Sequence, residues 1–456
     1  MNEIRKKEGR MLPQEFLNRM EKMLGEDYPL FLASYEREAY KGLRRNPLKA
    51  EQEEFENRMP FSLKEVSWTP TGYYYSLAEH PGQHPYHQAG LYYIQEPSAM
   101  AAAEYLQVKP GERVLDLCAA PGGKSTQIGG YLCGEGLLVC NEPHSARAKI
   151  LSENIERMGI TNALVTNEMP GKLAEIFPRY FDKILVDAPC SGEGMFLKNE
   201  EACLEWNPNN VQLCAKRQDE ILKEAAKMLR PGGCLVYSTC TFSEEENEGS
   251  INRFLTGHPE FAFVEEKRFW PHQVEGEGHY IAVLKKQGNP EQGDHPSSTN
   301  GYASAADLKE CPEFVRFQQE YLNLSSMPLW RKASEASLSE NWRLYFFGEQ
   351  LYHLPADMPS LKGLKVLRAG LHLGTVKKNR FEPSHALALA LKPSQAKYTI
   401  SLSSEGKEVR AYLSGQTFLA EGEKGWYLIA VDGYSLGWGK LAGGIMKNHY
   451  PKGLRR

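Results

Sequence analysis

The sequence predicts an α/β fold centred on a mostly parallel, doubly wound sheet. Short apolar runs alternate with longer stretches of helical periodicity between about residues 91 and 287. Runs of this length are typical of strands buried on both faces, and their alternation with helices is typical of βαβ units. A glycine-rich turn follows the first run, where folds of this class bind their ligands.

Six short apolar runs supply the candidate strands. They cover residues 114–117, 137–140, 184–187, 235–237, 261–264 and 280–284. A further strand is expected to end within residues 165–168. Helical stretches such as 146–158 and 211–229 lie between these runs, and the second ends in the helix-stop sequence Arg230-Pro231-Gly232-Gly233. In a parallel sheet of this kind the carboxyl ends of the strands share one edge, where we expect the functional residues.

The flanking regions predict additional domains. Residues 1–90 are expected to form a small α+β domain, with helical spacing over 13–24. The patch Tyr40-Lys41-Gly42-Leu43-Arg44-Arg45-Asn46 is either a solvated turn or a phosphate-contacting edge. Residues 91–287 form the core, 288–302 have the composition of a linker, and 303–456 are expected to form a separate C-terminal domain with short β-type segments and a basic tail.

Length and composition limit the classes of protein. A chain of 456 residues is too long for one ordinary core. The net charge of -4 means that any nucleic-acid contact must come from local basic patches. The nine cysteines include no C-x-x-C pair, so we expect neither a zinc site nor a disulfide framework, and the cysteine usage fits the cytoplasm. No stretch is long and apolar enough to span a membrane.

The turn after the first strand has the features of a cofactor loop. It runs Cys118-Ala119-Ala120-Pro121-Gly122-Gly123-Lys124, and a helix is expected to begin near Ser125. Glycines let a backbone approach a ligand closely, and a helix N-terminus offers free amide donors. A Walker A loop would need glycine at position 118, so an ATPase is disfavoured. Glu142 ends the next strand, where an acid can accept hydrogen bonds from ribose hydroxyls.

Two cysteine motifs stand at the ends of two later strands. One reads Asp187-Ala188-Pro189-Cys190-Ser191-Gly192, and the other reads Ser238-Thr239-Cys240. Neighbouring strand ends meet at the ligand crevice of a parallel sheet, so the pair predicts thiolate chemistry beside a bound cofactor. The other seven cysteines are interpreted as small buried hydrophobic residues: Cys118, Cys133, Cys140, Cys203, Cys214, Cys234 and Cys311.

These motifs resemble those of the Nop2/Sun family of RNA cytosine-5 methyltransferases. The matching segments are Gln95-Glu96-Pro97-Ser98, 116–125, 187–194 and 238–240. The resemblance implies a Rossmann-like class I methyltransferase with a seven-stranded, mostly parallel sheet that uses S-adenosylmethionine. It further implies that Cys240 is the nucleophile, that Cys190 assists breakdown of the covalent adduct, and that residues 118–124, Glu142 and Asp187 line the cofactor site.

The chemistry implied by the resemblance explains why these residue types are needed. Carbon 5 of cytosine is a poor nucleophile until a thiolate adds to carbon 6. A base must later remove the carbon 5 proton so that the thiolate can leave. We expect Asp187 to contact the cytosine edge, and donation to the ring nitrogen would require a raised pKa. Where the family places an aspartate near the adenine, this chain has Asn167 or Glu168.

The length and the C-terminal extension resemble the bacterial RsmF-like branch, which modifies 16S ribosomal RNA of the small subunit and ends in a PUA-like RNA-binding domain. The same chemistry on transfer RNA is one alternative, and a non-catalytic ribosome-assembly factor is another. An amino-group methyltransferase is disfavoured because such enzymes need no cysteine and commonly carry an Asn/Asp-Pro-Pro-aromatic motif. We expect RNA as the partner, no membrane association and a monomer.

Overall fold

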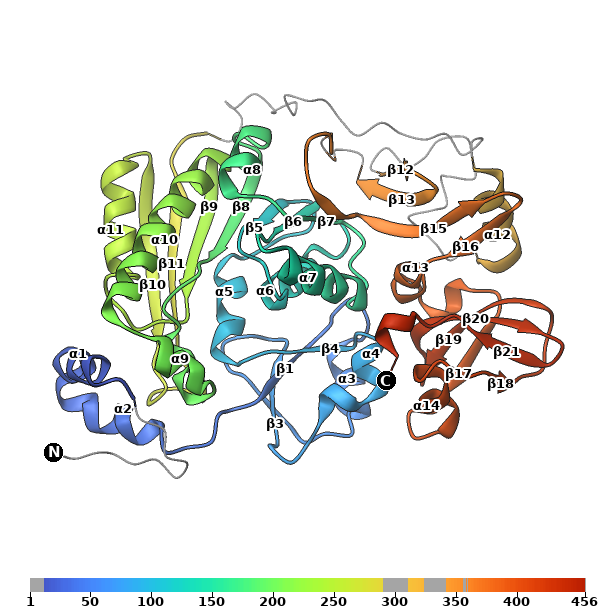
Figure 1. Cartoon of the computed structure of the whole chain (residues 1–456), viewed down its shortest axis with the longest axis horizontal. Helices are drawn as coiled ribbons and strands as arrows, with labels where there is room; N and C mark the ends of the chain where they lie inside the picture. The colour runs from blue at the N-terminus through green and yellow to red at the C-terminus, as the bar shows by residue number, and fades with distance from the viewer. Residues whose placement is uncertain (1–11, 290–310, 324–341, 356–357, 359, 456) are drawn as a thin grey trace.

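The computed structural model describes residues 12–289, 311–323, 342–355, 358 and 360–455 (Figure 1). Among these residues the largest sheet has eight strands in the order β10-β11-β9-β8-β5-β6-β7-β14. Its strands are β5 (Arg113–Asp116), β6 (Leu137–Asn141), β7 (Ala163–Thr166), β8 (Phe181–Asp187), β9 (Leu229–Thr239), β10 (Phe261–Phe269), β11 (His279–Lys286) and β14 (Val366–Ala369). Strands β9, β8, β5, β6 and β7 are parallel, and β11 pairs antiparallel with β9.

Helices cover both faces of this sheet, as the alternating pattern predicts. The helices of the core are α5 (Ala101–Tyr105), α6 (Gly123–Leu132), α7 (Ser145–Arg157), α8 (Pro170–Ile176), α9 (Glu200–Glu205), α10 (Pro208–Met228) and α11 (Glu248–Gly257). Successive strand residues face opposite sides, so Val114 packs with α5, α6 and α7 while Leu115 packs with α8, α10 and α11. Both faces are therefore buried, which is why the strands read as continuous apolar runs.

The predicted fold class is confirmed, with one addition to the sheet. Strands β5 to β11 supply the seven expected strands. The eighth, β14, comes from the C-terminal region and pairs antiparallel with β7. Arg368 on β14 also forms an ion pair with Glu156 on α7. The C-terminal region thus extends the core sheet, through a long-range pairing that no local sequence pattern predicts.

The N-terminal region contains a helical hairpin and a small sheet. The hairpin consists of α1 (Gln14–Leu24) and α2 (Tyr28–Ser34). The sheet has the order β2-β3-β1-β4, with β1 (Gly42–Arg45), β2 (Leu63–Glu65), β3 (Gly72–Tyr75) and β4 (Tyr92–Ile94), and it is accompanied by α3 (Gln52–Arg58) and α4 (Pro85–Gln88). Its edge strand β4 thus lies beyond residue 90.

The basic patch is not a solvated turn at its arginines: Gly42–Arg45 form the buried strand β1, while Lys41 before them is exposed. Arg44 is 1% exposed and Arg45 is 8% exposed. Arg44 donates hydrogen bonds to the carbonyl oxygen of Gly123 at 2.7 Å and to Oγ1 of Thr126 at 2.8 Å. The guanidinium therefore braces the start of α6, and a phosphate-contacting role for it is not supported by this geometry.

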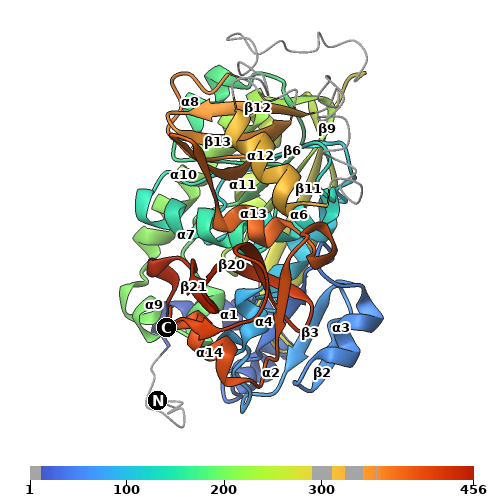
Figure 2. The same ribbon diagram turned by 90° about the vertical axis from the view of Figure 1, so that its right-hand side faces the viewer.

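The C-terminal region forms two further sheets (Figures 1 and 2). The first has the order β12-β13-β15-β16 and the second β17-β19-β20-β21-β18. The elements are α12 (Pro312–Tyr321), β12 (Trp342–Phe347), β13 (Gln350–Pro355), β15 (Leu371–Lys377), β16 (Arg380–Pro383), α13 (His385–Ala390), β17 (Thr399–Leu402), α14 (Lys407–Leu413), β18 (Phe418–Leu419), β19 (Gly425–Val431), β20 (Tyr434–Ala442) and β21 (Ile445–Asn448). The expected linker at 288–302 lies almost wholly outside the described residues.

The last sheet packs directly on the N-terminal domain. Leu43 and Tyr92 share one hydrophobic cluster with Ile429 and Met446. The hydroxyl of Tyr86 donates to Asp432 at 2.8 Å. Figure 1 shows the C-terminal end of the chain beside α4, and the Tyr450 hydroxyl donates to the side-chain oxygen of Gln88 on that helix at 3.2 Å. The N-terminal sheet region and the last C-terminal sheet, far apart in sequence, therefore share one hydrophobic cluster.

Candidate active site

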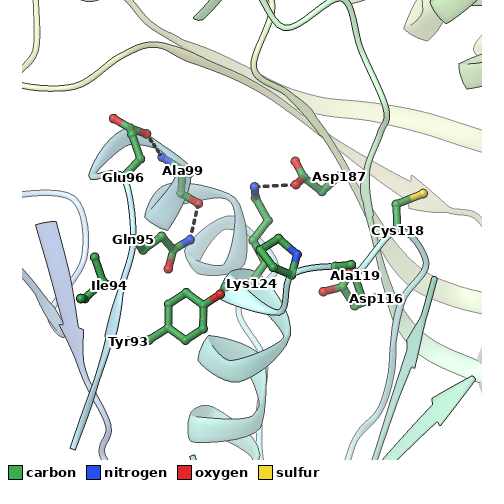
Figure 3. A pocket seen from close by; sticks show the side chains of 13 residues that line it. Tyr93, Ile94, Gln95, Glu96, Ala99, Asp116, Cys118, Ala119, Lys124 and Asp187 are labelled. Carbon is green, nitrogen blue, oxygen red and sulfur yellow. Dashed lines mark hydrogen bonds and ion pairs between the residues drawn. The ribbon is translucent and has the colours of Figure 1, made fainter. Parts of the chain in front are cut away.

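A cavity of about 230 Å³ opens at the carboxyl end of β5 (Figure 3). Its lining residues are Tyr93, Ile94, Gln95, Glu96, Ala99, Asp116, Cys118, Ala119, Ala120, Pro121, Gly123, Lys124 and Asp187. Gly122 stands at the N-cap of α6 with φ +111°, a conformation that L side chains rarely adopt. A Cβ on Gly123 would meet the Gln95 amide at 3.3 Å, so the second glycine allows the loop to approach β4.

The cavity gathers most of the predicted cofactor residues. Cys118, Ala119, Ala120, Pro121, Gly123, Lys124 and Asp187 all line it. Gly122, Glu142 and Asn167 are not among the lining residues, although they occupy the adjoining strand ends and turn. Of the other cysteines, Cys133 is exposed, which contradicts the expectation that it is buried.

Asp116 is a cavity residue that the motif analysis left without a role. Its Oδ2 accepts a hydrogen bond from Ser125 at 2.6 Å, while its Oδ1 has no partner. Burial raises the pKa of Asp116 to about 7, against the lowering effect of the Ser125 hydrogen bond. A buried oxygen without a partner beside a cavity marks a position where a ligand can donate. Its place at the end of the first strand was the signal that could have found it.

The wall formed by residues 93–96 was also missed as a cofactor contact. Tyr93 and Gln95 come from β4 and the turn after it, in the N-terminal sheet. The Gln95 amide donates to the carbonyl oxygen of Ala99 at 3.3 Å, and its side-chain oxygen accepts from Arg44 at 3.1 Å. The sequence motif 95–98 had marked this segment as part of the family resemblance, but only the folded chain places it opposite the glycine turn.

Glu142 and Asn167 lie together at the ends of β6 and β7. Glu142 accepts a hydrogen bond from the His144 backbone at 2.8 Å and lies 3.4 Å from Arg147. The Asn167 amide donates to the carbonyl oxygens of Glu142 and Pro143, both at 2.8 Å. Its side-chain oxygen therefore points away from these contacts, and the two residues form one structural unit next to the cavity.

Asp187 and Lys124 form an ion pair at the cavity mouth, drawn in Figure 3. The Lys124 ammonium lies 2.7 Å from Oδ2 of Asp187, and Ser238 donates to Oδ1 at 2.8 Å. Burial would raise the pKa of Asp187, but Lys124 outweighs it and the pKa is lowered. Donation from Asp187 to the ring nitrogen would require a raised pKa, so that role is not supported: Asp187 is an ionised acceptor, because a cation and a hydroxyl both stabilise its charge.

A buried histidine stands behind this ion pair. Nε2 of His279, the first residue of β11, lies 3.7 Å from Oδ1 of Asp187. Burial and the nearby Lys124 lower the pKa of His279 to about 3, so its ring is neutral at physiological pH. The histidine therefore adds no charge to the site.

The two motif cysteines meet beside this pair. Sγ of Cys190 lies 3.4 Å from Sγ of Cys240, within hydrogen-bonding range for sulfur. The hydrogen bond to Cys240, with burial and the charge of Glu246, raises the pKa of the Cys190 thiol well above its usual range. Cys240 contributes to the electrostatic environment of Lys124. The two thiols therefore have different charged neighbours: Glu246 acts on Cys190, and Lys124 interacts with Cys240.

Backbone and side-chain contacts fix the loops that carry these cysteines. The Gly194 amide donates to the carbonyl oxygen of Cys240 at 2.7 Å. A Cβ on Gly194 would lie 2.8 Å from that same oxygen, so the close approach requires glycine. Glu193, fully buried, accepts from the Phe242 amide at 3.0 Å and pairs with Arg19 of α1 at 2.5 Å. The N-terminal hairpin thus braces the Cys240 loop.

Comparisons with known proteins cover nearly the whole chain. A family model described as 16S rRNA methyltransferase RsmB/F matches residues 103–285, and the N-terminal domain of 16S rRNA methyltransferase RsmF matches 12–97. The first C-terminal domain of RsmF rRNA methyltransferase matches 330–391, and the RsmF PUA domain matches 398–456. Ribosomal RNA small subunit methyltransferase F of Aeromonas salmonicida is 30% identical over 486 residues, which cover 98% of this chain and 97% of the relative.

The chain belongs to the RsmF family of 16S ribosomal RNA methyltransferases. The protein of the same name from Vibrio campbellii is also 30% identical, over 98% of both chains. The predicted family and enzyme class are therefore confirmed. The match of four successive family models also accounts for the order of the N-terminal domain, the catalytic core and the two C-terminal sheets.

Solved structures resemble the core and part of its surroundings. A methyltransferase homolog protein from Pyrococcus horikoshii has a TM-score of 0.55 at 27% identity, covering 60% of this chain and 95% of that one. The NSun6 structure from the same organism has a TM-score of 0.53 at 22% identity, covering 61% of this chain and 99% of that one, and shows a shared fold. Within the described residues, no helix is long and apolar enough to cross a membrane.

Proposed function

We propose that this enzyme transfers a methyl group from S-adenosylmethionine to carbon 5 of a cytosine in 16S ribosomal RNA. The observation that carries the proposal is the pair of thiols 3.4 Å apart beside the Asp187–Lys124 ion pair. A single buried cysteine would be packing, but two at hydrogen-bonding distance next to a cation support covalent pyrimidine chemistry.

The cavity at the end of β5 suits the methyl donor. When bound, S-adenosylmethionine supplies an electrophilic methyl group on a sulfonium. Asp116 presents an unpartnered carboxylate oxygen that can accept from the ammonium of the methionine part. The glycine turn lets the backbone approach the ligand, and Glu142 stands where ribose hydroxyls would donate. The oxygen of Asn167 is an acceptor for an adenine amino group in place of the aspartate usual in the family.

The electrostatic difference between the thiols supports separate roles. Cys240 directly follows β9, whose Ser238 pairs with Asp187 in register, and it lies in the electrostatic environment of Lys124, so Cys240 is assigned as the nucleophile that adds to carbon 6. Cys190 stays protonated and donates its S–H toward Cys240. After a base removes the carbon 5 proton, the same hydrogen bond stabilises the Cys240 sulfur as it leaves as a thiolate, so losing Cys190 would slow collapse of the adduct more than its formation.

The ion pair provides recognition of the base. An ionised Asp187 accepts a hydrogen bond from the exocyclic amino group of cytosine, a group that uracil lacks. The Lys124 ammonium places positive charge where negative charge develops on the ring after thiol addition. Both tasks need a closed site, and the 93–96 wall and the glycine turn supply two of its sides.

Ribosomal RNA is proposed as the substrate because the relatives carry that name over their full length. The target cytosine must be splayed out of its stack, since carbon 6 is inaccessible within a helix. The C-terminal PUA-type sheet packs on the N-terminal domain and can hold the surrounding RNA as part of one surface. A ribosomal RNA substrate also supports the predicted cytoplasmic location. Monomeric behaviour stays a prediction.

The test is methylation of 16S ribosomal RNA and transfer RNA by the purified full chain, followed by bisulfite mapping. A single protected cytosine in 16S ribosomal RNA is expected, absent with Cys240→Ser. Modification of transfer RNA alone would move the assignment to the alternative substrate. No methylation of either RNA, with the cofactor bound, would favour a non-catalytic assembly factor.

A further inference from the structure

A buried carboxylate joins the two cysteine loops, outside the reactions assigned above. Glu246 lies in the turn that follows Cys240 and is fully buried. Its Oε2 accepts hydrogen bonds from the Ser191 backbone at 2.9 Å and from the Gln218 amide at 2.9 Å. Its Oε1 accepts from the Ser191 hydroxyl. Ser191 directly follows Cys190, so the carboxylate holds the Cys190 loop from the Cys240 side.

The hydroxyls of Thr241 and Ser191, which lie between the two cysteine loops, form a hydrogen-bonded chain whose donors all point the same way. The Ser243 amide donates to the Thr241 hydroxyl at 3.3 Å, and the Thr241 hydroxyl lies 2.9 Å from the Ser191 hydroxyl. Because Ser191 donates its own proton to Glu246, Thr241 must donate to Ser191. Every donor in the chain therefore points toward Glu246, an arrangement that an ionised carboxylate satisfies as acceptor only.

The orientation of the Gln218 amide confirms this direction. Its Nε2 reaches both Glu246 and the carbonyl oxygen of Pro189, at 3.0 Å from the latter. Its oxygen accepts from Ser250 at 3.2 Å. A flipped amide would place its oxygen against two acceptors, so the donor must face Glu246. All three donors to the carboxylate are thus neutral, and its negative charge is not cancelled by them.

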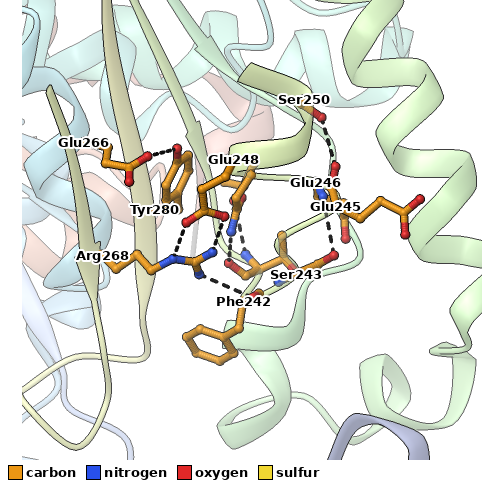
Figure 4. Close-up of polar contacts among 12 residues, drawn as sticks. Phe242, Ser243, Glu245, Glu246, Glu248, Ser250, Glu266, Arg268 and Tyr280 are labelled. Atoms are coloured by element: carbon orange, nitrogen blue, oxygen red, sulfur yellow. Dashed lines mark hydrogen bonds and ion pairs between the residues drawn. The ribbon is translucent and has the colours of Figure 1, made fainter. Parts of the chain in front are cut away.

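The turn that carries Glu246 is held rigidly on its other side (Figure 4). Arg268 of β10 donates to both oxygens of Glu248, at 2.7 and 2.5 Å, and to the carbonyl oxygen of Phe242 at 3.3 Å. The Tyr237 hydroxyl donates to the Glu246 carbonyl oxygen at 2.6 Å. Glu246 is therefore hydrogen-bonded through both its carboxylate and its backbone carbonyl oxygen, as well as buried.

We propose that Glu246 is the positioning residue that separates the roles of the two thiols. It ties the two loops together, and its negative charge disfavours a thiolate at Cys190, which therefore stays the S–H donor while Cys240 attacks. Only the catalytic consequence of this inference rests on the proposed function. The charge effect on Cys190 is a property of the folded protein and can be measured without RNA or cofactor.

The groups around Glu246 and Cys190 determine the pH range of the test. Those that face them are Glu193, Cys214, Tyr237 and Cys240. Burial raises the pKa of Glu246 to about 7, opposed by its hydrogen bonds. The Cys190 thiol titrates well above that, where Glu246 is ionised. A variant that removes the charge should therefore change the alkylation of Cys190 in the alkaline range.

The experiment measures initial alkylation rates of Cys190 and Cys240 with iodoacetamide from pH 7 to 11, resolved by peptide mass spectrometry on the full chain. In Glu246→Gln the midpoint for Cys190 should fall by about one pH unit, the usual size of a nearby like-charge effect. Glu246→Asp, which withdraws the charge by one methylene, should give a smaller fall. The matched control is Glu245→Gln, a neighbouring exposed carboxylate, and its midpoint should equal that of the wild type.

A wild-type midpoint in Glu246→Gln would overturn the proposal, as would equal shifts in Glu246→Gln and Glu246→Asp, which would indicate a steric effect. Circular dichroism checks folding, and if the glutamine variant does not fold, an unshifted Glu246→Asp decides against the charge effect. With RNA, Glu246→Gln should accumulate more covalent adduct than the wild type but less than Cys190→Ala, because Cys190 keeps its S–H at neutral pH while a glutamine amide cannot accept from all three donors that hold its loop. If the wild type methylates no RNA while the alkylation shift is present, the proposed function fails and the electrostatic inference stands.

Discussion

Replacing Arg44 should loosen the cofactor turn from the side of the N-terminal domain. Arg44 is buried on β1 and donates to Gln95, to the Gly123 carbonyl oxygen and to Thr126. Burial lowers its pKa to about 10, so it remains charged at neutral pH. Methionine keeps most of the aliphatic volume of Arg44, so the stability lost in Arg44→Met is that contributed by the three hydrogen bonds.

The loss of stability in Arg44→Met depends on which of the three hydrogen-bond acceptors of Arg44 find another donor in the variant. A hydrogen bond from a charged donor contributes about 1.5–3 kcal/mol. The Thr126 hydroxyl still donates to the Gly123 carbonyl oxygen at 3.0 Å in the variant, so one acceptor keeps a partner. Relief from burying the guanidinium offsets part of the remaining loss. We expect a net destabilisation of about 2–3 kcal/mol and a cofactor affinity weakened up to about tenfold, or 1.4 kcal/mol.

The measurements are thermal unfolding and calorimetric titration with S-adenosylmethionine. Lys41→Met is the matched control, because Lys41 is exposed and donates to the Leu77 carbonyl oxygen at the long distance of 3.3 Å. Arg44→Lys keeps the charge but cannot span three acceptors, so it should be intermediate. If Arg44→Met melts and binds like the wild type, the brace between β1 and the turn contributes nothing and this account of the buried patch is wrong.

Three other outcomes are expected. Denaturing gels should show an RNA–protein adduct with Cys190→Ala and none with Cys240→Ser, and the opposite pattern would reverse the roles of the thiols. Glu142→Ala should weaken cofactor binding by about 1–2 kcal/mol. This lies in the lower part of the range for a charged acceptor, because the Glu142 carboxylate already accepts a backbone hydrogen bond. An unchanged calorimetric affinity would rule out its contact with the ribose. Arg368→Ala should lower the free energy of unfolding by about 2 kcal/mol. This is less than for a fully buried ion pair, because the side chain of Glu156 is 23% exposed. An unaltered melting temperature would show that backbone pairing alone holds β14.

The sequence alone determined the parts of this protein that depend on local pattern. The apolar runs at 114–117 and 137–140 gave β5 and β6 because strands buried on both faces need continuous apolar residues. The order of motifs along a parallel sheet also placed Cys190 and Cys240 at neighbouring strand ends, since parallel strands present their carboxyl ends at one edge.

Only the tertiary structure decided properties that depend on distant partners. The pKa of Asp187 could not be predicted from its motif, because its direction depends on Lys124, 63 residues away. Residues 42–45 of the basic patch form a buried strand because β1 pairs with β3 and β4, and the Arg44 guanidinium finds acceptors on α6. Likewise β14 joins the core sheet through backbone hydrogen bonds to β7, which any sequence of strand-forming residues could make and which local periodicity therefore cannot reveal.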